Sequence, residues 1–189
     1  MAWNNEHKKK TRERILNSAA KLFAQNGFDH IGINDVMKDA GLTRGAFYAH
    51  FSSKAELYAE SIITAAMSTG RKTDPLNPEA PSFDGLLKTY LSMEHRQGDL
   101  FRCPLAFLTT DITQRDDQVR NAYTRVFKGF VKNLDKHSIQ QSGTKNTTRS
   151  MQQAVMLIGG LAIARAINDD ELAKELLSSC HAALATPAL

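Results

Sequence analysis

The sequence of 189 residues has little of several features that mark particular classes of protein. Its two cysteines, Cys103 and Cys180, are too few for a disulfide framework, and no Cys-x-x-Cys pair is present to bind zinc. The longest apolar run, residues 154–164, has eleven residues, whereas a membrane span needs about 18. The polar N-terminus also lacks the apolar stretch of a secretory signal. We therefore expect a soluble, cytoplasmic protein with no membrane partner.

Motifs of catalysis are missing as well. The six histidines are scattered, and the sequence has no His-Glu-x-x-His zinc motif, no Gly-x-Ser-x-Gly nucleophile elbow and no Walker phosphate loop. The sequence therefore predicts no enzyme, no cofactor and no metal site. A helical enzyme and a helical protein–protein module are the alternatives to a DNA-binding protein. The protein–protein module would show no salt-dependent affinity for DNA, whereas a DNA-binding protein would.

The net charge of +4 is small, but it is unevenly distributed. Residues 1–54 contain nine basic and five acidic side chains, so the remaining 135 residues are neutral overall. Five of the nine basic residues lie between Lys8 and Arg14. A basic N-terminal segment on a neutral body is typical of a protein that binds a polyanion. The alternative is a solvated basic start of a helix.

Apolar residues recur at helical spacing along most of the chain, and strand-like alternation is almost absent, which predicts an all-α fold. The predicted helices are a first one ending near Asn26 and others at 33–40, 44–50, 54–68, 83–97, 104–113, 116–141, 148–167 and 171–185. Residues 73–82 hold three prolines and no periodic pattern, so we expect a loop there. This loop divides the chain into predicted domains at 1–72 and 73–189.

The helices at 33–40 and 44–50 are short and close together. Gly41 between them can form a tight turn, and we expect Leu42 to be the buried residue of that turn. Thr43 is expected to cap the second helix, its hydroxyl accepting a hydrogen bond from a backbone N–H group of the first turn. A short helix, a glycine turn and a capped second helix predict a helix-turn-helix, whose second helix can enter the DNA major groove.

The second of these helices has distinct inner and outer faces. Phe47 and Phe51, four residues apart, would anchor it in the core. On the outer face Arg44 can bind guanine or a phosphate, Gly45 leaves room for a base edge, and Tyr48 offers a hydroxyl.

His50 and Lys54 lie where the next helix begins, and backbone N–H groups there, with the lysine charge, favour an anion. The alternative interpretation is that Tyr48 and His50 pack against neighbouring helices.

The motif A-G-L-T-R-G-A-F-Y-A-H-F, followed by K-A-E-L, resembles the DNA-binding domain of TetR-type (TetR/AcrR) transcriptional repressors, and the resemblance covers residues 11–62. It implies an N-terminal three-helix DNA-binding head, an all-helical regulatory domain and a homodimer built mainly from the last two long helices. By position, the implied DNA-contacting residues are Thr43, Arg44, Gly45 and Tyr48, with His50 and Lys54 supporting the contact with the DNA backbone. Gly32 departs from the family, which usually has Thr or Ser there, so no phosphate contact is expected at that position.

The last two helices carry the largest apolar faces. The helix at 148–167 is apolar around much of its circumference and contains Gly159-Gly160, which favours close packing of another backbone. The helix at 171–185 has one leucine-rich stripe. Together they predict a dimer interface. A helix buried within one monomer is the alternative.

Candidate effector-binding residues are spread over the other helices of the second half. They are Tyr90, His95, Phe101, Cys103, Phe107, Tyr123 and Phe127. A few polar groups among aromatic rings suit a small, mostly apolar effector. For any single one of these residues, packing in the core is the alternative.

Cys103 also opens a predicted helix between Arg102 and Pro104, which predicts a lowered thiol pKa. Besides control by a small-molecule effector, the repressor could therefore sense oxidants or electrophiles through Cys103. The opposite interpretation of Cys103 is an inert, buried cysteine.

These features predict a transcriptional repressor that responds to a ligand. A homodimer would place two recognition helices in successive major grooves of a palindromic double-stranded DNA operator. A small-molecule effector would bind the second domain and favour a spacing that releases the DNA.

Overall fold

The computed structural model describes residues 2–73, 75–77, 79–99 and 102–185, and within them it contains eleven helices and no strand. Their bounds are α1 Ala2–Asn26, α2 Ile33–Asp39, α3 Arg44–Phe47, α4 Lys54–Thr73, α5 Phe83–Tyr90, α6 Met93–Gln97, α7 Pro104–Phe107, α8 Thr109–Ile112, α9 Asp117–Ser142, α10 Thr147–Ala166 and α11 Asp170–Ala185. The predicted all-α fold is confirmed. No helix within these described ranges is both long and apolar enough to cross a membrane.

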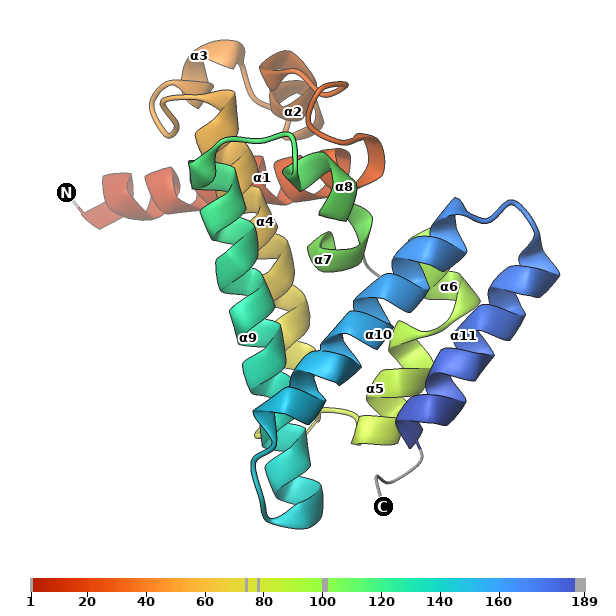
Figure 1. Cartoon of the computed structure of the whole chain (residues 1–189). Coiled ribbons are helices and arrows are strands. Elements are labelled where there is room, and N and C mark those ends of the chain that lie inside the picture. Colours follow the sequence, from red (N-terminus) through yellow and green to blue (C-terminus); the bar gives the residue numbers. More distant parts are fainter. Residues whose placement is uncertain (1, 74, 78, 100–101, 186–189) are drawn as a thin grey trace.

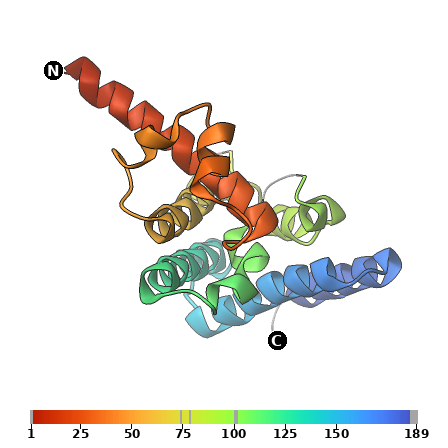
Figure 2. The ribbon, with the colours of Figure 1, turned by 90° about the horizontal axis from the view of Figure 1, so that it is seen from above.

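The helices form a small head above a larger body (Figure 1). Helices α1 to α3 and the start of α4 make the head, and α4 continues down into the body beside α9. Helices α10 and α11 pack against each other on the other side of the body, with α5 and α6 next to them. Seen from above, the beginning of α1 projects away from the rest of the molecule (Figure 2).

Two predicted helices are each interrupted in the structure. The expected helix at 83–97 breaks at Leu91, whose backbone is not helical, and Ser92 then caps α6 by accepting a hydrogen bond from the His95 N–H group at 3.1 Å. The expected helix at 104–113 breaks at Leu108, with φ −119° and ψ 5°. Apolar periodicity continued across both breaks, so it did not reveal them.

Two apolar cores hold the fold, and they do not follow the division at residue 73. The lower core gathers side chains of α5, α7, α9, α10 and α11. The upper core fills the head, but it also contains Leu108, Ile112, Val119 and Ala122 from beyond the loop. Because the head is completed by the second half of the chain, α8 and the start of α9 position it.

Candidate nucleic-acid interface and cavity

The turn between α2 and α3 is held by α1. Gly41 has φ +64°, a left-handed conformation that glycine adopts without strain. Next to it, Leu42 N–H donates to the Met37 carbonyl at 2.8 Å, and the Arg14 guanidinium donates to the Ala40 carbonyl at 2.7 Å. Leu42 is half-buried and packs against the upper core, whereas Gly41 and Thr43 on either side of it are exposed. The contact with Arg14 fixes the turn in its place.

The inner face of α3 anchors it in the head. Phe47 is fully buried, Phe51 is 3% exposed, and their rings stack with centroids 5.8 Å apart. The Arg12 guanidinium lies 4.7 Å from the centre of the Phe51 ring and forms an ion pair with Glu60 of α4. This contact ties α1 and α4 to the segment that follows α3.

The outer face of α3 faces solvent. Thr43, Arg44 and Gly45 are exposed, and the Tyr48 side chain is 59% exposed. Thr43 is the residue before the helix, as predicted, but its hydroxyl makes no capping hydrogen bond, which corrects the expectation. Its hydroxyl is therefore not used to hold the first turn of α3. An exposed basic, aromatic and hydroxyl-bearing surface on a rigid support can bind a polyanion.

His50 and Lys54 are placed differently from the exposed residues of α3. Both are half-buried, and the Lys54 ammonium lies 4.1 Å from the centre of the Phe28 ring. Burial lowers the pKa of Lys54, and Asp29 opposes that shift. Burial, followed by the charges of Lys8 and Arg12, lowers the pKa of His50. At Gly32, the departure from the family pattern, the backbone N–H donates to the Asp35 carboxylate at 2.8 Å.

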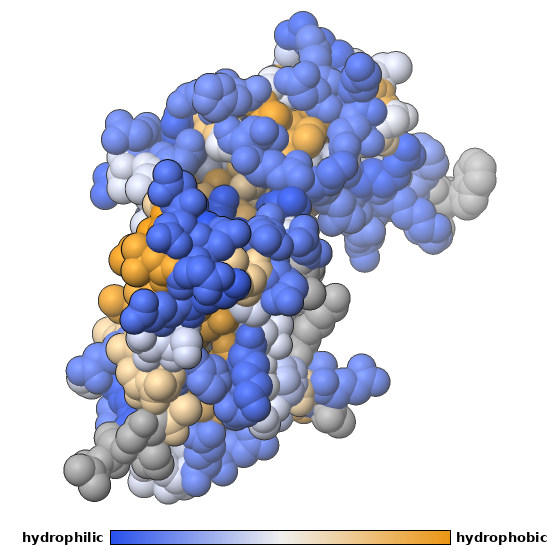
Figure 3. Space-filling view, turned by 90° about the vertical axis from the view of Figure 1, so that its right-hand side faces the viewer, coloured by the Kyte–Doolittle hydropathy of each residue, from blue (hydrophilic) through white to orange (hydrophobic). Residues whose placement is uncertain are grey.

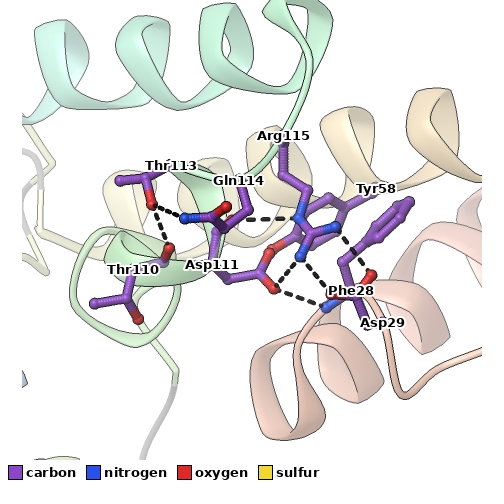
Figure 4. A network of polar contacts seen from close by, with 8 residues as sticks. All are labelled: Phe28, Asp29, Tyr58, Thr110, Asp111, Thr113, Gln114 and Arg115. Atoms are coloured by element: carbon purple, nitrogen blue, oxygen red, sulfur yellow. Dashed lines mark hydrogen bonds and ion pairs between the residues drawn. The ribbon is translucent and has the colours of Figure 1, made fainter.

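A polar network joins the head to the second half of the chain (Figure 4). Asp111 of α8 is at its centre: one carboxylate oxygen accepts a hydrogen bond from the Tyr58 hydroxyl at 2.6 Å. The other oxygen accepts from the Phe28 N–H group and from Arg115, each at 3.2 Å. Arg115 also donates to both carboxylate oxygens of Asp29, at 3.0 and 2.6 Å. The network therefore connects α4 and the end of α1 to the segment between α8 and α9.

Asp111 is the more buried of the two carboxylates in this network: 18% of its side chain is exposed, compared with 68% for Asp29. Burial, together with the hydrogen bond to Asp111, raises the pKa of Tyr58. The Tyr58 hydroxyl therefore keeps its proton and remains a donor at neutral pH. The Arg115 guanidinium also lies 4.7 Å from the centre of the Phe28 ring.

A cavity of about 500 Å³ opens between α4, α5, α7 and α9. The described residues of its lining are mostly apolar, and those that carry a charge are basic. The lining residues are Ile63, Ala66, Met67, Thr69, Gly70, Leu86, Tyr90, Cys103, Pro104, Leu105, Arg125, Val126, Gly129, Phe130, Lys132, Asn133 and Lys136. Ligand sites in proteins commonly have this size and this mixture of apolar and polar groups.

Two of the predicted effector residues, Tyr90 and Cys103, line this cavity. Four others lie outside its lining. The His95 and Phe107 rings stack on each other, 5.9 Å apart, and the Tyr123 hydroxyl donates to the Leu105 carbonyl at 2.8 Å.

Phe127 packs against the lower core, and Phe101 lies outside the described residues. The basic side chains of α9 and the apolar ones of α4 were not identified from the sequence, because only the packing of α4 against α9 brings them together.

Cys103 precedes α7, as predicted, but the expected lowering of its pKa was wrong. Cys103 is 7% exposed, and burial raises the pKa of its thiol. The Tyr90 hydroxyl donates a hydrogen bond to its sulfur at 3.2 Å, which does not offset the burial. A buried neutral thiol reacts slowly with oxidants and electrophiles. The structure therefore argues against the redox-sensing alternative. Within the described residues, no group of His, Cys, Asp and Glu side chains could hold a metal ion.

An exposed helix-turn-helix on a helical body defines a DNA-binding protein class. Residues 15–61 match the family model described as bacterial regulatory proteins, tetR family. The matching segment is 44% identical over 50 residues to the transcriptional regulator AcrR of Shigella flexneri, covering 26% of this chain and 23% of that one. Residues 15–61 therefore form a DNA-binding domain of the TetR/AcrR type.

The rest of the chain is more divergent. The regulator LmrA of Bacillus subtilis is 23% identical over 166 residues, which cover 82% of this chain and 86% of LmrA. The chain aligns with only 23% and 34% of the length of the regulators AcrR and YfiR. Reduced NemR of E. coli has a similar fold, with a TM-score of 0.76 at 19% identity, covering 95% of this chain and all of that one. A TetR-family regulator from Cytophaga hutchinsonii gives 0.74 at 20% identity, covering 95% of each chain.

Proposed function

We propose that this protein is a transcriptional repressor that binds a palindromic DNA operator as a homodimer and is released from it by a small-molecule effector. The observation that carries this proposal is the outer face of α3. Its exposed residues, Thr43, Arg44, Gly45 and Tyr48, stand on a helix that Phe47 fixes in the core. A short, rigidly supported helix with exposed donors can enter a major groove and contact both bases and phosphates.

Basic residues of α1 support the same interface. Lys8, Lys9 and Lys10 are exposed on a helix that projects from the head (Figure 2). Lys8 lies close enough to His50 for its charge to lower the pKa of that imidazole, so the positive charge of α1 reaches the segment between α3 and α4. Positive charge next to a recognition helix neutralises phosphates and makes the DNA affinity depend on salt.

Helices α10 and α11 support the dimer. Four large apolar side chains are exposed on them, Met151, Val155, Ile163 and Leu172, with exposed fractions of 49% to 65%. Apolar surface gathers at the edge of the body on the side of α10 and α11, at the left of Figure 3. Gly159 lies between Val155 and Ile163, and a Cβ added to it would meet nothing within 4 Å. An apolar helix face with a glycine at its centre allows a second copy to approach closely.

Helix α4 links the cavity to the head. It begins at Lys54 beside α3, and further along it contributes Ile63, Ala66 and Met67 to the cavity wall. A ligand that shifts this wall moves the same helix on which the head rests, and the network around Asp111 transmits the movement to α1. Effector binding then favours a dimer whose two α3 helices no longer match successive grooves.

The test begins with DNA selected from a random pool by the full-length protein, with affinity measured by fluorescence anisotropy. Arg44→Ala weakens binding about 10- to 100-fold, because a bidentate base contact is worth about 1–3 kcal/mol. Tyr48→Phe weakens it about 3- to 10-fold through one lost hydrogen bond. Arg120→Ala, which removes an exposed positive charge on α9, is the matched control and leaves the affinity unchanged.

Light scattering shows whether each variant stays dimeric, as the proposal requires. Unchanged affinity in Arg44→Ala would contradict the proposed interface, and a monomer at micromolar concentration would contradict the dimer. Any compound that raises the melting temperature of the protein is then added to the protein–DNA complex. Release of the DNA supports the proposed direction of control, and tighter binding contradicts it.

A further inference from the structure

We propose that the cavity binds an amphiphilic anion, a ligand with a mainly apolar body and one negatively charged head, and that the head lies against the basic side of α9. This inference rests on the proposed function, in which the cavity is the effector site, and it adds the chemical class of the effector.

The charge of the lining is one-sided. Among the described residues that line the cavity, Arg125, Lys132 and Lys136 are the only charged ones, all three belong to α9, and none is a carboxylate. Their spacing along the helix, seven and then four residues, places them on one face of α9. An anion therefore meets three positive charges on one wall, while a cation is repelled and a neutral ligand gains nothing from them.

The positive charges mark the opening of the cavity. Arg125 and Lys132 are exposed, and Lys136 is half-buried. Neither Arg125 nor Lys132 forms an ion pair with another residue that the structure describes, so their charges are available to a ligand. Gly129 lies one helical turn after Arg125, and a Cβ added to it would meet nothing within 4 Å. The missing side chain leaves space for a head group between Arg125 and Lys132.

The inner wall is suited to an apolar body. Tyr90, Cys103 and Leu105 are 2%, 7% and 1% exposed. The two polar groups among them satisfy each other, because the Tyr90 hydroxyl donates its only hydrogen to the Cys103 sulfur. Burial raises the pKa of both residues, so this wall carries no charge at neutral pH. A carboxylate at this wall would lose its hydration without finding a charged partner. The ligand is therefore oriented with its charged head away from this wall, towards solvent.

The experiment compares three ten-carbon probes on the full-length protein by isothermal titration calorimetry: decanoate, 1-decanol and decylamine. Decanoate is expected to bind about 10-fold more tightly than 1-decanol, because its carboxylate forms partly solvated ion pairs with the basic side chains of α9. Decylamine is expected to bind the most weakly, because its positive charge is repelled. The preference for decanoate over 1-decanol shrinks as sodium chloride is added, since salt screens exposed charges.

Substitutions in α9 and α4 test which side chains cause the preference for decanoate. Arg125→Gln/Lys132→Gln lowers the decanoate affinity about 10-fold and leaves the 1-decanol affinity unchanged. Lys128→Gln removes an exposed positive charge on the same helix, outside the lining, and leaves both affinities unchanged. Ala66→Phe fills the cavity from α4 and weakens both probes, with circular dichroism verifying that this variant is folded.

Equal affinity for decanoate and 1-decanol would overturn the proposal, as would the absence of binding by any probe or an equal effect of Lys128→Gln. Operator binding is measured separately with the selected DNA. If the protein binds DNA but shows no preference for decanoate, the ligand class is wrong and the proposed function stands. If no DNA is selected, the proposed function fails, while the decanoate preference still decides the ligand class.

Discussion

The two candidate sites are built in opposite ways. The candidate DNA interface is a continuous segment, residues 43–54, whose exposed side chains stand on the buried rings of Phe47 and Phe51. The cavity is assembled from four helices, and its lining spans residues 63–136 and faces inward. A local motif defines the first site, whereas the packing of distant helices defines the second. The two sites share one structural element, α4, which begins in the head and ends at the cavity.

The largest expected effect tests whether the two halves are separate folding units. Phe47→Ala removes a fully buried ring from the upper core and is expected to cost about 4 kcal/mol of unfolding free energy. Since both cores share Phe107, Tyr123 and Val126, calorimetry should show one transition at a lower temperature. Two separated transitions would show that the head and the body unfold independently, which would contradict the shared core.

A pH titration examines the body alone. Burial lowers the pKa of His95 to about 4, below the value of about 6.5 in the unfolded chain. The neutral His95 therefore stabilises the fold fully above pH 6.5, and this contribution is lost as the pH falls towards 4. The expected loss is about 3 kcal/mol, measured by urea unfolding at several pH values. His95→Gln flattens the pH dependence, and the exposed His7→Gln does not; identical curves for His95→Gln and the wild type would refute this assignment.

The network between the halves is expected to have a smaller effect. Asp111→Ala removes the acceptor of the buried Tyr58 hydroxyl and breaks the ion pair with Arg115. We expect a loss of about 2 kcal/mol in unfolding free energy. The control is Asp117→Ala, an exposed carboxylate nearby in the sequence. An effect of Asp111→Ala no larger than that of the control would mean that apolar packing alone joins the halves.

The smallest effect concerns the two adjacent glycines of α10. A Cβ on Gly160 would lie 2.9 Å from the Cys180 sulfur, whereas one on Gly159 would meet nothing. The change in unfolding free energy caused by Gly160→Ala should therefore be about 1 kcal/mol less favourable in the wild type than in a Cys180→Ala background. In that background the contact is gone, and the higher helix propensity of alanine stabilises the protein. Gly159→Ala serves as the reference and changes stability equally in both backgrounds. Equal effects of Gly160→Ala would show that Cys180 simply rotates away.

The sequence predicted the head more accurately than the body. Local patterns identified α2 and α3 within one or a few residues, and they placed Phe47 and Phe51 in the core. In the body the same reasoning missed the breaks at Leu91 and Leu108, because apolar periodicity continues through both positions. It also expected Thr43 to cap α3 with its hydroxyl, which depends on a rotamer that no local pattern fixes.

Cys103 shows why electrostatic predictions needed the fold. Its place before α7, beside Arg102, favours a lowered pKa, and the sequence gives no sign of its burial. In the structure it is buried in the lower core beside Tyr90 of α5, and the cost of desolvating a thiolate exceeds the benefit of the helix terminus. The basic wall of α9 was missed for a related reason: Arg125, Lys132 and Lys136 look like a solvated helix face until α4 packs beside them.

By itself, the sequence determined the all-helical fold, the helix-turn-helix and the concentration of positive charge in the first 54 residues. These properties follow from side chains within about twenty positions of one another, where periodicity and turn chemistry decide the outcome. Only the tertiary structure decided that α8 and the start of α9 complete the core of the head and that four helices enclose a cavity. The burial of a side chain depends on neighbours that are distant in the sequence, and its pKa depends on that burial. Both are therefore decided by tertiary packing.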